Sequence, residues 1–116
     1  MFKRLTQWQA RPGLDREAAV GHWTGEHVRL VVQVPHLLGY VQDISVPGLD
    51  GAEPPYAGMG ETWFATLEDA QLATNSPEWA AVIDDARTFM DFDRLVVAWV
   101  QENVRLPPPR VGPSTG

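Results

Sequence analysis

The sequence predicts an α+β protein in which two strand–helix–strand units build one four-stranded antiparallel sheet. One segment repeats buried-type residues every three or four positions, as on one face of a helix: Ala19, Trp23, His27, Leu30, Val31 and Val34. Four other segments are short and rich in β-branched and aromatic residues, which is typical of strands. Proline, glycine and helix-capping residues separate these segments. The 116 residues, 44% of them hydrophobic, are enough for one domain with a modest core.

The chain begins with a predicted strand and helix. Residues 1–9 roughly alternate apolar and polar side chains, as a strand does. A Pro-Gly pair then makes a turn, and Asp15 suits the N-cap of a helix. Pro35 disfavours helical backbone at the residue before it, so we expect the helix to run over about residues 16–33.

The middle of the chain predicts two strands joined by a long loop. Residues 36–46 are too apolar and β-branched for a loop, and residues 59–65 form a similar segment. Residues 47–58 between them hold three prolines and three glycines. A loop of this length is either a solvated surface loop or a functional lid, and its residues leave both interpretations open.

The last third predicts a second helical region and a fourth strand. Thr66 suits a helix N-cap, and Pro77 suits the first position of a helix. The helical region therefore divides into two pieces, residues 67–74 and 77–88. Residues 94–104 are apolar on both sides, as expected of a strand that is covered on both faces.

The resulting order, strand–helix–strand–strand–helix–strand, is the ferredoxin-like βαββαβ pattern. We expect this domain to occupy residues 1–105 and the Pro-rich residues 106–116 to form an extended or disordered tail. Helices cover only one face of such a sheet. Because the fourth strand is apolar on both sides, we expect a homodimer in which two sheets pack face to face.

Composition and motif content exclude several classes of function. The net charge of −6, with nine scattered Lys and Arg residues, argues against nucleic acid or a membrane surface as a partner. The absence of cysteine excludes disulfides, thiolate zinc sites and cysteine nucleophiles. Without a signal-peptide pattern or a bilayer-spanning segment, we expect a cytoplasmic protein. The phosphate-loop, dinucleotide and hydrolase-elbow motifs are missing, and we expect neither a cofactor nor a metal.

The three histidines have different predicted environments. His27 lies in the apolar stripe of the first helix, where an imidazole must find a hydrogen-bond partner. It is either a structural histidine bonded to a backbone carbonyl or an acid/base group at the floor of a pocket between helix and sheet. His22 lies on the polar face and is expected to pair with Glu26. His36 is expected to start the second strand, and neither of these two needs a functional role.

Aromatic residues suggest an apolar pocket. Trp23, Tyr40 and Trp63 are candidates to line it, with the Tyr40 hydroxyl available to a carbonyl or phenol oxygen. The carboxylates around the end of the second helical region lack the spacing of a calcium loop, and we expect most of them to be solvated. They are Asp84, Asp85, Asp91 and Asp93.

Several motifs together resemble those of the EthD family. They are WTGEH at residues 23–27, PHLLGY at 35–40, GETWF at 60–64, SPE at 76–78 and DARTFMD at 85–91. The resemblance covers nearly all of residues 1–104. It implies a dimeric α+β barrel with a ligand pocket between the helices and the concave sheet of each monomer.

The same resemblance implies roles for individual residues. The family's histidine maps onto His27 and its tyrosine after proline onto Tyr40, which makes these two the candidate catalytic residues. The candidate substrate-binding residues are Trp23, Trp63, Phe64, Asp85 and Phe89.

The wider group to which the resemblance points includes cofactor-free dehydratases, decarboxylases, isomerases and monooxygenases. We therefore expect a small hydrophobic ligand, an aromatic or polyketide-like carbonyl compound. His27 would move a proton during dehydration, decarboxylation or isomerisation. A cofactor-independent monooxygenase and a non-catalytic accessory protein that binds the same kind of ligand are the alternatives.

Overall fold

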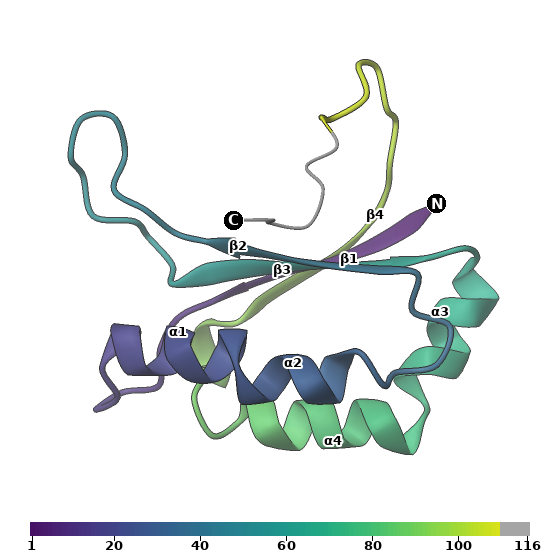
Figure 1. Ribbon diagram of the computed structural model, residues 1–116, viewed down its shortest axis with the longest axis horizontal. Coiled ribbons are helices and arrows are strands. Elements are labelled where there is room, and N and C mark those ends of the chain that lie inside the picture. Colours follow the sequence, from purple (N-terminus) through teal and green to yellow (C-terminus); the bar gives the residue numbers. More distant parts are fainter. Residues whose placement is uncertain (110–116) are drawn as a thin grey trace, which may run out of the picture.

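The computed structural model describes residues 1–109 as one sheet with helices on one side of it (Figure 1). The elements follow the chain in this order: β1 Phe2–Trp8, α1 Arg16–Thr24, α2 Glu26–Val31, β2 Gly39–Ile44, β3 Gly58–Phe64, α3 Leu67–Thr74, α4 Pro77–Ala86, the short 3₁₀ helix η1 Phe92–Arg94 and β4 Val96–Gln101. Of the predicted tail, residues 106–109 are exposed and have no regular structure, and the rest lies outside the described residues.

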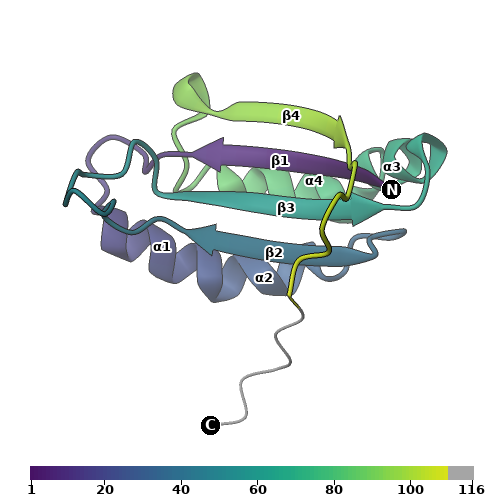
Figure 2. The same ribbon diagram turned by 90° about the horizontal axis from the view of Figure 1, so that it is seen from above.

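The sheet has the strand order β2-β3-β1-β4, and all neighbouring strands are antiparallel. This arrangement confirms the predicted ferredoxin-like α+β fold. Seen from above, α1 and α2 run beneath the β2 edge, and α4 runs beneath the middle of the sheet (Figure 2).

Strand alternation separates the residues of the two sheet faces. Arg4, Thr6 and Trp8 of β1 all line a cavity under the sheet, so the even-numbered positions of this strand face the helices. In the β1–β3 register Arg4 stands opposite Thr62, and in the β2–β3 register Thr62 stands opposite Tyr40. Three side chains from three strands therefore form one row on the helix side.

The first helix is shorter than predicted and is broken in the middle. Asp15 caps α1 as expected, since its carboxylate accepts a hydrogen bond from the Ala18 N–H. At Gly25 the backbone leaves the helical region, with φ −106° and ψ −96°, and α2 begins anew at the next residue. A Cβ at Gly25 would lie 3.1 Å from the Gly21 carbonyl oxygen. Because glycine has no Cβ, the backbone at Gly25 can approach this oxygen without a tight contact.

Other element boundaries moved by a few residues. His36 does not start a strand: it lies in the turn after Pro35, with a left-handed φ of 65°, and β2 begins only at Gly39. The predicted start of the last strand instead holds the short helix η1, which is capped by the Asp91 side chain.

Two clusters of buried side chains join the helices to the sheet. One surrounds Trp8 and Trp23, whose rings meet edge to face with centroids 5.2 Å apart. The other surrounds Phe64 and Val31. The two clusters fix α1, α2 and α4 against β1 and β3, and the cavity that Trp8, Trp23 and Val31 line lies beside them.

In the part of the chain that the structure describes, all helices lie on one side of the sheet, and the opposite face carries none (Figure 1). Lys3 Nζ lies 2.9 Å from Glu61 Oε1 and 3.4 Å from Glu102 Oε2 on this face. Val41, paired with Glu61, and Val96, paired with Gln7, leave 41% and 55% of their surface exposed. We refer to this surface as the open face.

Candidate functional site

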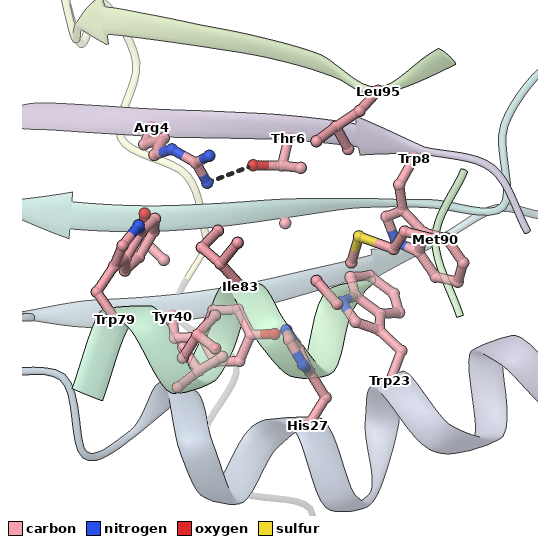
Figure 3. Close-up of a pocket in the computed structure, with 15 residues that line it drawn as sticks. Arg4, Thr6, Trp8, Trp23, His27, Tyr40, Trp79, Ile83, Met90 and Leu95 are labelled. Atoms are coloured by element: carbon pink, nitrogen blue, oxygen red, sulfur yellow. Dashed lines mark hydrogen bonds between the residues drawn. The ribbon is translucent and has the colours of Figure 1, made fainter. Parts of the chain in front are cut away.

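A cavity of about 60 Å³ lies between the sheet and the helices (Figure 3). Its walls are mainly apolar and come from β1, β2, β3, α1, α2 and α4 together with the segment after α4. The residues that line it are Arg4, Thr6, Trp8, Trp23, His27, Val31, Tyr40, Gly60, Thr62, Trp79, Val82, Ile83, Ala86, Met90 and Leu95. None of the residues of the long loop between β2 and β3 is among them.

His27, in the first turn of α2, is a buried residue that lines this cavity. Only 4% of its surface is exposed, and its Nδ1 lies 2.8 Å from Asp85 Oδ2. A carboxylate only accepts hydrogen bonds, so Nδ1 carries the proton and Nε2 keeps its lone pair. Burial lowers the pKa of His27, and the Asp85 carboxylate opposes this effect only in part. His27 is therefore an uncharged imidazole at neutral pH.

Asp85 of α4 holds two histidines at once. Its carboxylate accepts the bond from His27 and a second from His22 Nε2, at 2.9 Å to Oδ1 and 3.0 Å to Oδ2. Partial burial would raise the pKa of Asp85, but the hydrogen bonds from His27 and His22 outweigh it and leave that pKa below its usual value. The expected pairing of His22 with Glu26 is wrong, because the break at Gly25 places these two residues on different helices.

Tyr40 of β2 reaches the cavity from the sheet, and its hydroxyl points toward the His27 ring (Figure 3). The Gln42 amide donates one hydrogen bond of 2.8 Å to the Tyr40 hydroxyl oxygen and another of 2.8 Å to the Trp23 carbonyl. Burial raises the pKa of Tyr40 to about 12, despite the opposing effects of the Gln42 and Trp23 side chains. Tyr40 is thus a neutral phenol whose oxygen is already an acceptor, and its proton is available to a ligand.

The structure brings together only some of the residues that the sequence singled out. Trp23, His27 and Tyr40 line the cavity. Asp85 and Phe89 lie behind His27, with the Phe89 ring 5.1 Å from the imidazole, edge to face. They support the histidine and do not form part of the cavity wall.

The other two predicted wall residues lie elsewhere. Phe64 is fully buried in the second core cluster, and its ring centroid lies 5.9 Å from that of Trp99. Trp63 lies on the open face, where its indole N–H donates to Glu102 and Lys3 Nζ sits 5.0 Å from its ring centroid. Adjacent strand residues point to opposite sides, so Trp63 and Phe64 could not share a wall.

Sequence reasoning missed four polar residues of the site, Arg4, Thr6, Thr62 and Gln42, and also the indole N–H of Trp8. A signal for Arg4 was present, because it occupies the same face of the first strand as Trp8 and Phe2. Burial lowers the pKa of Arg4 to about 10, and the guanidinium keeps its charge at neutral pH.

Two further properties bear on function. Within residues 1–109, no cluster of three or more histidine, aspartate or glutamate side chains is arranged to hold a metal ion. In the same part of the chain no helix is both long and apolar enough to cross a membrane.

The fold and the site define a ferredoxin-like α+β protein in which a buried histidine, paired with a half-buried aspartate, lies beside a mainly apolar cavity. The sequence profile of the EthD domain matches residues 11–93, and the chain belongs to the EthD family. A search of curated proteins gave no match.

Solved structures support the same fold. An ethyl tert-butyl ether D (EthD) family protein from Bacillus halodurans C-125 is 24% identical, with a TM-score of 0.75 over 89% of this chain and 100% of that one. A dimeric ferredoxin-like protein of unknown function from Thermobifida fusca YX is 12% identical, with a TM-score of 0.68 over 85% and 88%. A dimeric protein of unknown function with a ferredoxin-like fold from Bacteroides fragilis NCTC 9343 is 9% identical, with a TM-score of 0.65 over 87% and 95%.

Proposed function

We propose that the cavity binds a small hydrophobic carbonyl compound and that His27 removes a proton from the carbon next to the carbonyl group. The protein would then be a cofactor-free enzyme of the dehydratase, decarboxylase or isomerase type. The observation that carries this proposal is the hydrogen bond from His27 Nδ1 to Asp85, which leaves Nε2 as the basic nitrogen of a residue that lines the cavity.

The histidine–aspartate pair suits a general base. Uncharged His27 accepts the proton from the C–H bond at Nε2, and the electron pair of that bond moves toward the carbonyl oxygen to give an enolate. Asp85 stabilises the imidazolium that forms and keeps the ring in one tautomer. The apolar walls exclude water and strengthen the attraction between these charges.

Tyr40 suits the role of a hydrogen-bond donor to the carbonyl oxygen of the ligand. Its proton is free to bond to the carbonyl oxygen on which negative charge develops, because Gln42 already donates to the phenol oxygen. Trp23 adds a flat apolar wall next to this pair of groups. A planar, unsaturated or aromatic carbonyl compound matches this combination of walls and donors.

The test uses acetoacetamide, a small neutral compound with an exchangeable C–H between two carbonyl groups. Its exchange of hydrogen for deuterium is followed by ¹H NMR, with protein-free buffer as the blank. We expect catalysed exchange by the wild-type protein, a loss of about 10²-fold or more in His27→Gln, and no change in the exposed control Glu26→Gln. Wild-type exchange in a folded His27→Gln protein would contradict the proposal.

The same experiment separates the two alternatives. Binding of acetoacetamide without catalysed exchange would favour a non-catalytic accessory protein. Consumption of dissolved oxygen during the reaction would favour a cofactor-independent monooxygenase instead.

We also propose that the protein forms a homodimer through the open face. Exposed Val41 and Val96 give this face apolar surface, and the pairing of Lys3 with Glu61 and Glu102 reduces its charge. Two similar solved proteins are described as dimeric. A partner sheet on this side leaves the cavity intact, because the cavity lies under the opposite face.

A further inference from the structure

The guanidinium of Arg4 places a charge in a mainly apolar cavity. Its guanidinium donates one 2.8 Å hydrogen bond to the Thr6 hydroxyl and lies 4.8 Å from the ring centroid of Trp79. No salt bridge joins it to any carboxylate of residues 1–109. Charges that are withdrawn from water are normally paired, and this half-buried guanidinium has no compensating carboxylate within residues 1–109.

Two more polar atoms of the cavity lining have no hydrogen-bond partner within residues 1–109. They are the indole nitrogen of Trp8 and the hydroxyl of Thr62, in residues that are 0% and 7% exposed. Such atoms are rare in folded proteins, because each costs the desolvation of a donor or acceptor. Thr62 stands directly opposite Arg4 in the β1–β3 register, where side chains on one face are neighbours.

The polar groups of the cavity therefore lie on two layers. Arg4 and Thr62 belong to paired strands and line the cavity from the sheet. His27 projects into it from α2 on the helical side (Figure 3). Tyr40 stands next to Thr62 in the same sheet row and directs its hydroxyl toward His27, so it connects the two layers.

We propose that the ligand of this cavity carries a carboxylate, which Arg4 and Thr62 bind while His27 faces the carbon next to its carbonyl group. This inference rests on the proposed function, because it names the chemical group at the other end of the ligand that His27 deprotonates. A planar carboxylate matches the fork of one guanidinium, with Thr62 as an additional donor. A phosphate group carries more charge and has more oxygen atoms to pair than the donors of Arg4 and Thr62 can match.

The experiment compares acetoacetate with acetoacetamide, which have the same shape and differ in charge at one end. Dissociation constants are measured by NMR on the tryptophan indole N–H signals, because Trp8 and Trp23 line the cavity. The variants are Arg4→Met, which keeps the length of the side chain, and Arg4→Lys, which keeps the charge without the planar fork. Arg29→Met, an exposed arginine on α2, is the matched control.

We expect the wild-type protein and Arg29→Met to bind acetoacetate about tenfold or more tightly than acetoacetamide. Arg4→Met should lose this preference and keep its affinity for acetoacetamide, and Arg4→Lys should fall between the two. Equal affinity of the wild-type protein for the two compounds would overturn the inference. So would a full preference for acetoacetate in Arg4→Met.

Thr62→Val provides a second variant that does not depend on the folding of Arg4→Met. Valine keeps the shape of threonine and removes a hydroxyl that has no partner. We expect unchanged or higher thermal stability together with weaker binding of acetoacetate, whereas unchanged affinity would contradict a role for this hydroxyl.

Different results would overturn the carboxylate site and the proposed function. If both compounds bind equally and acetoacetamide still exchanges its proton, the carboxylate site is wrong and the proposed function stands. If neither compound binds or exchanges, the proposed function is wrong and the carboxylate site falls with it.

Discussion

His27 and Asp85 are 58 residues apart in the chain, and a 2.8 Å hydrogen bond joins them between α2 and α4. The bond fixes the tautomer of the only histidine that lines the described cavity. Four predictions follow from this pair and from the surfaces around it.

Asp85→Asn should reduce catalysed exchange of acetoacetamide by about 10²-fold or more, because the amide does not stabilise the imidazolium as a carboxylate does. Asp85 raises the pKa of His27 against the effect of burial, so its removal should lower that pKa further. An NMR titration of the His27 ring measures this shift. An unchanged titration would contradict the positioning role of Asp85, and Asp84→Asn, one residue earlier on α4, is the control.

The exchange rate should rise with pH and reach a plateau in neutral solution. Burial lowers the pKa of His27 from its ordinary value of 6.5, so the basic form already predominates above that value. The half-maximal rate is therefore expected below pH 6.5. A midpoint above this value in the wild-type protein, measured by NMR over a pH series, would exclude neutral His27 as the base.

Replacement by alanine should affect two glycines of β3 differently, lowering stability at Gly58 and ligand affinity at Gly60. A Cβ at Gly58 would meet the Trp23 ring at 2.7 Å, so Gly58→Ala is expected to cost about 1–3 kcal/mol of unfolding free energy. A Cβ at Gly60 meets only one Trp23 atom, at 4.0 Å, so Gly60→Ala should fold normally and narrow the cavity. Its affinity for acetoacetamide should fall roughly tenfold. Chemical denaturation and NMR titration measure the two effects.

Val96 and Val97 offer a matched pair for the proposed dimer. Both are exposed residues of β4, and they point to opposite sides of the sheet. Val96→Glu places a charge on the open face and should weaken dimerisation by about tenfold or more in sedimentation equilibrium. Val97→Glu should leave the dimer unchanged, and equal effects of the two variants would argue against this interface.

The sequence predicted the topology because the periodicity of each segment was clear. The helical stripe identified Trp23 and His27 as buried, and both are. The caps Asp15 and Thr66, together with Pro77 at a first helical position, predicted where helices begin. These features depend on residues close together in the chain, which a single sequence displays directly.

The partners of the site residues were not predictable in this way. Nothing near His22 or His27 in the chain indicates Asp85, because their contact depends on how α4 packs against α1 and α2. The break at Gly25 was also missed, since a glycine weakens a helix without showing where it ends. The alternation of β3 did contain the information that Trp63 and Phe64 face opposite sides.

The cavity takes its groups from two separate layers. The helices supply the hydrogen-bonded pair of His27 and Asp85, to which we assign the proposed proton transfer, whereas the sheet supplies the row of Tyr40, Thr62 and Arg4. Under the two proposals, a substitution at position 4 or 62 would alter which ligand is accepted without touching the helical pair. Substrate preference and reaction would then vary independently, so ligand preference should be compared along the sheet row and chemistry along the helices.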